Sequence, residues 1–283
     1  MNTETDRPCH GHRARKRFGQ NFLRDQAVTD RLVRAINPRQ SDHVVEIGPG
    51  QGALTHGLLA AGRLDLVELD FDLTPHLRRL FGHHPQVTVY EADALKVDFS
   101  QLLRDGGSEG ADNKDERRLR VVGNLPYNIS TPLIFHLLSH KNSMADMHFM
   151  LQKEVVDRLS AQPGQAGYGR LSVMVQYHCQ AEGLFTVAPE AFVPQPRVQS
   201  AIVRLTPHRT LPFPCADEAL FARIVKAAFA TRRKTLSNSL KGLFTAQELK
   251  QLGIDPGIRA ERLPVQSLVQ LANYRASAVA NST

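Results

Sequence analysis

The stretch of sequence that decides the fold is Val44-Val45-Glu46-Ile47-Gly48-Pro49-Gly50-Gln51-Gly52. Its first half is a short apolar run that predicts a buried β-strand, and its second half is a glycine-rich turn. Leu54, Leu58 and Leu59 follow at helical spacing, so the turn opens a helix. A strand, a glycine turn and a helix in this order make a ligand-binding corner in parallel α/β sheets, because the helix N-terminus attracts electron-rich groups.

Similar apolar runs recur on both sides of this corner. A helical pattern begins at Asp25 and ends at Asn37-Pro38, and further strands are expected at 64–69, 87–90, 119–122 and 147–151. Strands that alternate with helices predict βαβ units and a mostly parallel sheet with helices on both faces. Two later runs, 184–187 and 201–205, have no helix between them and predict an antiparallel hairpin at the sheet edge.

The composition changes after this sheet. Residues 206–217 are rich in proline and predict a linker, and the patterns at 218–230, 247–252 and 266–276 are helical. We therefore expect a catalytic domain at 1–206, with a basic tail at 1–24, and a small all-helical domain at 207–283. The glycine-rich, charged segment 105–118 is expected to form a surface loop.

Composition narrows the class of protein. The chain has 283 residues, of which 42% are hydrophobic, and its formal net charge of +7 favours polyanionic partners. Its three cysteines and its two histidine pairs lack metal-site spacing, so we expect no metal. No apolar run approaches the ~20 residues of a membrane span. The N-terminus lacks the pattern of a secretory signal, so we expect a cytoplasmic protein without a membrane partner.

The glycine turn fits two classes of cofactor. Gly48, Gly50 and Ala53 satisfy the G-x-G-x-x-A pattern that is typical of nicotinamide and flavin enzymes, but methyltransferases use a similar corner. Pro49 stiffens the turn between the glycines. Glu46 places a carboxylate beside the turn, where a zwitterion with a sulfonium is tolerated better than a pyrophosphate. These residues favour S-adenosylmethionine.

Two further acids stand at the ends of the next strands. Glu68 follows the turn by about twenty residues, where an acid can accept hydrogen bonds from ribose hydroxyls. Asp93 follows the third strand, where it can accept a hydrogen bond from an adenine amine. A lone acid at such a place is often only a helix cap. Acids at three successive strand ends favour a cofactor that contains adenosine.

The end of the fourth strand carries the candidate chemistry, in Asn124-Leu125-Pro126-Tyr127. An adenine amine is a poor nucleophile because its lone pair is delocalised into the ring. The side-chain carbonyl of Asn124 and the main-chain carbonyl of Leu125 can accept its N–H bonds and hold it in line with a sulfonium methyl group. Pro126 rigidifies the turn, and Tyr127 offers a ring on which the base can stack. Phe192 is a second candidate for stacking, although a core position is its alternative interpretation.

Two basic clusters are candidate phosphate contacts. One lies in the N-terminal tail and the other lies on and after the first helix of the C-terminal domain. A charged helix face is often only solvated, but two clusters at opposite ends of the sequence favour binding of a nucleic acid. The candidate RNA-binding residues are Arg15, Lys16, Arg17, Arg223, Lys226, Arg232, Arg233 and Lys234.

These motifs together resemble the bacterial small-subunit ribosomal RNA adenine dimethylases. The resemblance runs from about Arg13 to Tyr274 and rests on the segments 17–23, 46–52, 124–130, 192–200 and 229–236. It implies a Rossmann-like class I methyltransferase sheet with the small helical domain described above. It also implies a cofactor pocket formed by Asn21, Leu23, Gly48, Gly50, Glu68, Asp93 and Asn124. The segment 105–118 is longer than is usual for the family.

The resemblance also implies the reaction and the substrate. A member of this family would add two methyl groups to the N6 amine of each of two adjacent adenosines near the 3′ end of 16S rRNA, with S-adenosylmethionine as the donor. We expect the substrate to be the immature small ribosomal subunit and the enzyme to be a monomer. The alternatives are a macrolide-resistance-type methylase of large-subunit rRNA and a ribosome-assembly factor whose catalysis is incidental.

Overall fold

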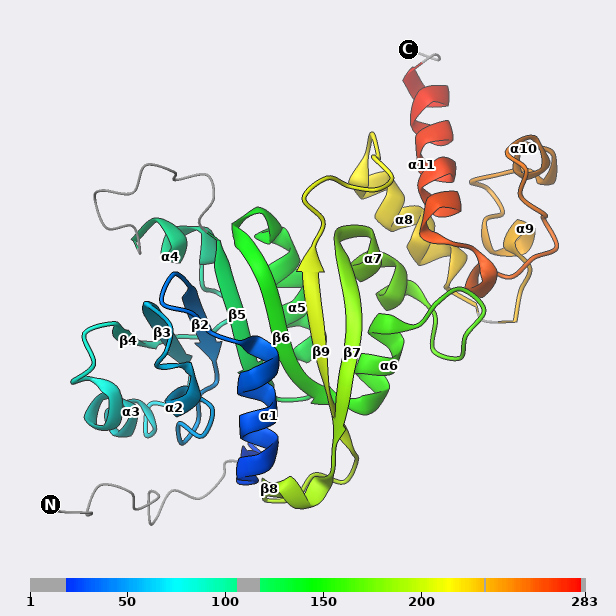
Figure 1. Cartoon of the computed structure of the whole chain (residues 1–283). Coiled ribbons are helices and arrows are strands. Elements are labelled where there is room, and N and C mark those ends of the chain that lie inside the picture. Colours follow the sequence, from blue (N-terminus) through cyan, green and yellow to red (C-terminus); the bar gives the residue numbers. More distant parts are fainter. Residues whose placement is uncertain (1–18, 106–117, 232, 281–283) are drawn as a thin grey trace, which may run out of the picture. The chain divides into compact units, whose positions relative to one another are not determined.

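The computed structural model describes residues 19–105, 118–231 and 233–280 (Figure 1). It divides into two compact units, Met1–Lys153 with Gly183–Pro207, and Glu154–Glu182 with His208–Thr283. The second unit therefore includes 154–182, which the sequence interpretation placed in the domain at 1–206. The division of functions between the two parts stays a prediction.

The first unit is built on a seven-stranded sheet with the order β4-β3-β2-β5-β6-β9-β7. The strands are β2 (His43–Ile47), β3 (Arg63–Glu68), β4 (Val87–Glu91), β5 (Leu119–Asn124), β6 (Met144–Gln152), β7 (Cys179–Val187) and β9 (Ser200–Pro207). The strands β4, β3, β2, β5 and β6 pair in parallel, and β9 pairs antiparallel to β6. The expected mostly parallel sheet is confirmed, and the two late strands lie together at its edge.

Helices lie on both faces of this sheet. Figure 1 shows α1 in front of the strands and α5 behind them. The helices of this part are α1 (Gln26–Ile36), α2 (Thr55–Leu58), α3 (Thr74–Phe81), α4 (Phe99–Asp105) and α5 (Ser130–Ser139), with the short 3-10 helices η3 (Lys141–Ser143) and η4 (Pro189–Ala191). Helix α1 begins where the side chain of Asp25 accepts a hydrogen bond from the backbone N–H of Val28, and it ends at Asn37 in the left-handed conformation. Its Leu32 and Ile36 pack with sheet residues in one apolar cluster.

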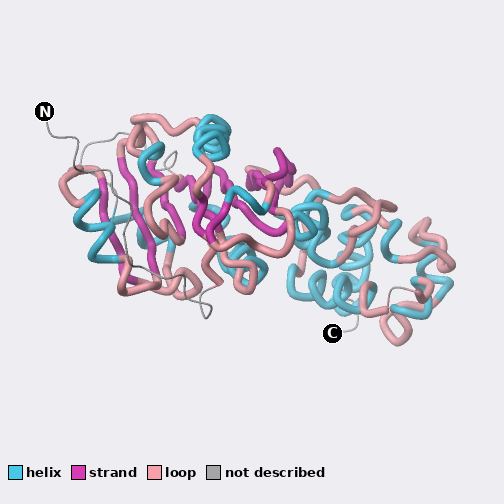
Figure 2. Tube along the Cα trace, turned by 90° about the horizontal axis from the view of Figure 1, so that it is seen from below, coloured by secondary structure: helices cyan, strands magenta, loops and turns pink. Residues whose placement is uncertain are grey.

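The second unit is predominantly helical, as Figure 2 shows for the C-terminal part. Its helices are α6 (Lys153–Ser160), α7 (Arg170–His178), α8 (Glu218–Ala228), α9 (Leu236–Ser239), α10 (Ala246–Gln251), α11 (Val265–Ala280) and η5 (Ala260–Arg262). Phe221, Ile224 and Val225 of α8 are fully buried in an apolar cluster that also holds Val173 and Leu271. This unit therefore has a core of its own.

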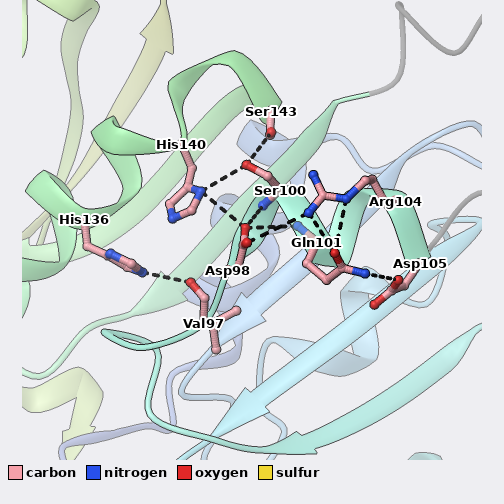
Figure 3. A network of polar contacts seen from close by, with 9 residues as sticks. All are labelled: Val97, Asp98, Ser100, Gln101, Arg104, Asp105, His136, His140 and Ser143. Atoms are coloured by element: carbon pink, nitrogen blue, oxygen red, sulfur yellow. Dashed lines mark hydrogen bonds and ion pairs between the residues drawn. The ribbon is translucent and has the colours of Figure 1, made fainter.

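A polar network fixes α4 at the edge where the parallel strands begin (Figure 3). The His140 ring nitrogen Nδ1 lies 3.0 Å from the Ser100 hydroxyl and 3.6 Å from the Asp98 carboxylate, and His136 contacts the carbonyl of Val97. Burial lowers the pKa of His140, and the neighbouring His136 lowers it further. The network holds the stem of the segment 105–118, and residues 106–117 of the expected loop lie outside the described residues.

Candidate functional site

A pocket opens at the carboxyl ends of the parallel strands. Its empty volume, with the open solvent at its mouth included, is about 1240 Å³. The structure brings together all seven residues that the sequence interpretation assigned to the cofactor. Asn21, Leu23, Gly48, Gly50, Glu68, Asp93 and Asn124 all line this pocket, with Leu125, Pro126 and Tyr127. Their roles stay predictions.

The glycine turn lines the pocket, and its backbone adopts left-handed conformations there. Gly48 and Gly50 have φ angles of +65° and +60°. A Cβ atom on Gly50 would lie 3.1 Å from the ring of Phe22, so a side chain there would crowd the wall of the pocket. Glycine is the residue that adopts this conformation without steric cost.

Two buried acids lie beside the glycine turn, and Glu68 holds it directly. Glu68 is 6% exposed, and its side chain accepts hydrogen bonds from the backbone N–H of Gly50 at 3.1 Å and of Asp70 at 2.8 Å. Glu46 is 2% exposed and accepts a hydrogen bond from the Thr55 hydroxyl at 2.7 Å. Burial raises the pKa of both acids, and that of Glu46 rises to about 8. Glu46 is therefore protonated at neutral pH, and backbone N–H groups partly offset the effect of burial on the pKa of Glu68.

The third acid has a local role as well. One oxygen of Asp93 accepts a hydrogen bond from the backbone N–H of Leu95 at 3.0 Å, which is the turn-forming role of a lone acid. Asp93 nevertheless lines the pocket and is only partly buried. A carboxylate can accept several hydrogen bonds, so the local bond leaves Asp93 able to receive an amine of a ligand.

The amide of Asn124 is oriented by the N-terminal segment. Its Nδ2 donates a hydrogen bond to the main-chain carbonyl of Asn21 at 2.8 Å, across a separation of 103 residues. The nitrogen is thus engaged, and the side-chain oxygen is the group that Asn124 can offer to a bound amine. The next residue, Leu125, is held through its N–H by the carbonyl of Met150 at 3.1 Å. The turn at residues 124–127, which we call the candidate catalytic turn, is therefore fixed before any substrate binds.

Residues 19–24, which we call the strap, are tied to several parts of the pocket. The Gln20 side chain donates to Asp70 at 2.9 Å, and Arg24 donates to Gln51 of the glycine turn at 2.8 Å. Strand β1 (Phe22–Leu23) pairs antiparallel with β8 (Phe192–Val193). The strap thus links the glycine turn and Asp70 to Asn124 of the candidate catalytic turn. The resemblance pointed to residues 21 and 23, but the roles of Gln20 and Arg24 depend on contacts distant in sequence.

Tyr127 is anchored by its hydroxyl. The hydroxyl lies 2.7 Å from the Ser200 hydroxyl at the start of β9, and Ser200 is fully buried. The tyrosine ring is partly buried and lines the pocket. Burial raises the pKa of Tyr127, so the phenol stays neutral and can serve as a stacking surface. Ser200 was part of a quoted motif, but its contact with Tyr127 could not be read from the sequence.

Phe192 does not take the place expected for a second stacking ring. It is 1% exposed and packs in the apolar cluster that contains Leu23, Met150 and Ile202. It is not among the residues that line the pocket. Its partner in β1 is Leu23, so the strap covers it. In this conformation Phe192 is a core residue, which was its alternative interpretation, and the stacking role is not supported.

The candidate RNA-binding residues are only partly described. Arg15, Lys16, Arg17 and Arg232 lie outside the described residues. Arg223 and Lys226 are exposed on α8 three residues apart, and therefore on one face of the helix, and Arg233 and Lys234 are exposed in the turn before α9. These four residues belong to the second unit.

The residues of the pocket fit S-adenosylmethionine. Burial raises the pKa of both Glu46 and Glu68, so a ligand with cationic groups would favour the charged forms of these acids, whereas a pyrophosphate would disfavour them. Within the described residues, no cluster of histidine, cysteine and acidic side chains could hold a metal ion. Over the same residues, no helix is both long and apolar enough to cross a membrane.

Comparison with known proteins gives a consistent family. The family model described as "Ribosomal RNA adenine dimethylase" matches residues 11–277. A protein of Hahella chejuensis named "Ribosomal RNA small subunit methyltransferase A" is 57% identical over 93% of this chain and 93% of its own length. A protein of the same name from Pseudomonas aeruginosa is 54% identical over 95% of this chain and 97% of its own length.

Solved structures share the fold. The crystal structure of a dimethyladenosine transferase from Plasmodium falciparum matches with a TM-score of 0.71 and 25% identity, over 88% of this chain and 95% of that chain. The 23S rRNA methyltransferase ErmE matches with a TM-score of 0.70 and 24% identity, over 91% of this chain and 100% of that chain. The likeness to ErmE shows the fold alone. The resemblance inferred from the motifs and the expected class of fold are confirmed.

Proposed function

Because this chain belongs to the ribosomal RNA adenine dimethylase family, we propose that it adds two methyl groups to the N6 amine of each of two adjacent adenosines near the 3′ end of 16S rRNA. It is a ribosomal RNA methyltransferase of the small-subunit class. The observation that carries the assignment to adenine is the fixed amide of Asn124 in a pocket that also contains buried Glu46 and Glu68.

In the proposed mechanism, each group around the target amine has a separate role. When bound, S-adenosylmethionine supplies a methyl group made electrophilic by its sulfonium. In the first transfer, the side-chain oxygen of Asn124 and the carbonyl of Leu125 accept the two N6–H bonds, which turns the nitrogen lone pair out of conjugation and toward the methyl group. The N–C bond forms as the S–C bond breaks, and one N6 proton leaves to solvent. In the second transfer, a single N6–H bond remains to be accepted. Tyr127 stacks on the base, a contact worth about 1–3 kcal/mol. No strong base is required, because positioning supplies most of the acceleration.

The cofactor would be held by three parts of the chain. Gly48 and Gly50 let the backbone approach the methionine part of the cofactor closely. Glu68 accepts hydrogen bonds from the ribose hydroxyls, and Asp93 accepts a hydrogen bond from the adenine amine. The strap closes the arrangement through Asn21 and Leu23. We propose this cofactor without a metal, since the reaction needs no Lewis acid to activate a leaving group that is already cationic.

The substrate would be the immature small subunit, bound by a monomer in the cytoplasm. Arg223, Lys226, Arg233 and Lys234 are exposed and would contact phosphates, together with the N-terminal basic tail. If the protein contacts about six phosphates, its affinity for the RNA should fall roughly a thousandfold between low and moderate salt. A large-subunit target is not favoured, because the relatives that cover nearly the whole chain at more than half identity carry the small-subunit name. A role in ribosome assembly would be a second function beside methyl transfer.

The test is to map the modified nucleotides. Small subunits and large subunits from cells that lack the modification would be incubated with the protein and labelled S-adenosylmethionine, and their rRNA would be analysed by mass spectrometry. We expect N6,N6-dimethyladenosine at two adjacent positions near the 3′ end of 16S rRNA. Transfer to 23S rRNA, or methylation at a carbon or ring nitrogen, would contradict the proposal.

A further inference from the structure

The surface beside the catalytic turn carries apolar side chains that the protein does not cover. Among the described residues, the large hydrophobic side chains that are exposed are Leu69 (48%), Phe71 (52%), Val193 (56%) and Val198 (45%). Leu69 and Phe71 follow the carboxyl end of β3, Val193 is the last residue of β8, and Val198 lies in the loop between β8 and β9. Leu69 lines the pocket, so a bound cofactor would cover it. Val193 and Val198 do not line it, and a cofactor there leaves them exposed.

The two valines adjoin residues that line the pocket or contact its lining. Val193 pairs in register with Phe22 of the strap, and Phe22 lines the pocket. Val198 precedes by two residues Ser200, whose hydroxyl anchors Tyr127. The loop that contains both valines ends where the N–H of Lys153 donates to the carbonyl of Gln199 at 2.9 Å. Figure 1 shows β8 at the lower edge of the sheet, where this loop begins.

The loop 193–199 is also the right kind of surface for RNA. Its residues are exposed except for Pro196, and Arg197 provides a cation next to Val198. An adenosine that reaches Tyr127 must leave its stack, which exposes apolar faces of the neighbouring bases to water. Proteins that unstack nucleic acids often insert apolar side chains at such steps. Exposed valines next to an arginine therefore match an unstacked base and its phosphate.

We propose that the loop 193–199 is a contact surface for the RNA that flanks the target adenosine, with Val193 and Val198 packed on an unstacked base and Arg197 on a phosphate. This inference rests on the proposed function and names residues that the catalytic turn does not include. The partner of this loop is RNA, because the loop adjoins the pocket that the target base must enter.

The experiment compares two kinds of contact on the same loop. Small subunits that lack the modification are titrated with wild type, the double variant Val193→Ser/Val198→Ser, and Arg197→Gln at several salt concentrations, and kcat/KM for methyl transfer is measured in parallel. Each valine is about half exposed, so covering both should raise the affinity for the small subunit about tenfold. The double variant should therefore lose about tenfold in affinity and in kcat/KM. Its salt dependence should equal that of wild type. Arg197→Gln should lower the slope of log K against log salt by about one.

The controls separate this surface from the cofactor site and from general charge. Affinity for S-adenosylhomocysteine, measured by calorimetry, should be unchanged in all three proteins. Arg39→Gln removes an exposed arginine where the parallel strands begin, and it should leave the salt slope unchanged. The nearly isosteric Val193→Thr/Val198→Thr keeps the shape of the loop and should show a smaller loss in the same direction.

Four results would overturn the inference. The first is a double serine variant with wild-type affinity and kcat/KM, and the second is a loss of S-adenosylhomocysteine affinity in that variant. The third is a serine variant that unfolds while the threonine variant behaves as wild type. The fourth is a photo-cross-linker on Val198→Cys that labels a ribosomal protein instead of 16S rRNA. Absence of methyl transfer by wild type would instead contradict the proposed function. The two failures are therefore distinguishable.

Discussion

Replacing Glu46 by glutamine should make the stability of the protein less dependent on pH. Glu46 is 2% exposed, and burial raises its pKa from 4.5 to about 8, with the charge of Glu68 adding to the effect and the Thr55 hydrogen bond opposing it. The folded protein therefore holds a proton on Glu46 that the unfolded chain releases. Stability from this group is fully present below pH 4.5 and is lost as the pH rises toward 8.

The size of the effect follows from the two pKa values. The interval from 4.5 to 8, at about 1.4 kcal/mol for each pH unit, gives a ceiling of about 5 kcal/mol on the unfolding free energy that wild type loses through this group. Glutamine is uncharged at every pH, and its side-chain carbonyl can still accept the Thr55 hydroxyl. Glu46→Gln should therefore be as stable as wild type near pH 5 and more stable by a few kcal/mol near pH 9.

Urea unfolding at about pH 5, 7 and 9 would measure this difference directly. Glu91→Gln is the matched control, because Glu91 is an exposed acid at the end of β4, and it should leave the pH profile of wild type unchanged. Parallel stability profiles for wild type and Glu46→Gln would refute the reasoning, since they would mean that the buried acid carries no proton linked to folding.

Three other substitutions test separate contacts. Ser200→Ala removes the partner of the Tyr127 hydroxyl and should lower kcat/KM about fivefold for roughly 1 kcal/mol; the double variant with Tyr127→Phe should lose no more than either single variant, and additive losses would contradict the contact. Gln20→Ala and Arg24→Ala each release one end of the strap and should weaken S-adenosylhomocysteine binding several-fold in calorimetry, whereas unchanged affinity would show that the strap does not help to hold the cofactor. Gly52→Ala forces a Cβ to 2.7 Å from the Phe81 ring at a φ of +84° and should lower the melting temperature more than Gly164→Ala, which has a φ of +85° and no atom within 4 Å; equal losses would assign the cost to the backbone alone.

The sheet could be predicted from the sequence because its strands are short apolar runs that end in turns. The run 44–47 and the strand β2 (His43–Ile47) differ by one residue, and Glu68 and Asp93 lie at the pocket because parallel strands end at one edge. These features depend on local pattern and on one rule of topology. They require no knowledge of contacts between distant segments.

The parts that could not be predicted depend on such contacts. The bond from Asn124 to the carbonyl of Asn21 joins residues 103 apart, and no local pattern shows which way an amide will turn. Phe192 has the composition of a stacking residue, but its pairing with Leu23 buries it. The sequence pattern placed α6 and α7 in the first domain. In the structure they belong to the second unit, where the hydroxyl of Tyr168, between the two helices, donates to the carbonyl of Leu263 at 2.9 Å.

The central claim is that the fixed amide of Asn124 presents the target adenine amine to the methyl donor. The most direct measurement is single-turnover methyl transfer to unmodified small subunits by wild type, Asn124→Ala and Asn124→Asp, with S-adenosylhomocysteine affinity and small-subunit affinity measured on the same preparations. We expect Asn124→Ala to bind the small subunit as wild type does and to transfer methyl groups at least a hundredfold more slowly. An Asn124→Ala protein that methylates the two adenosines at the wild-type rate would contradict the account.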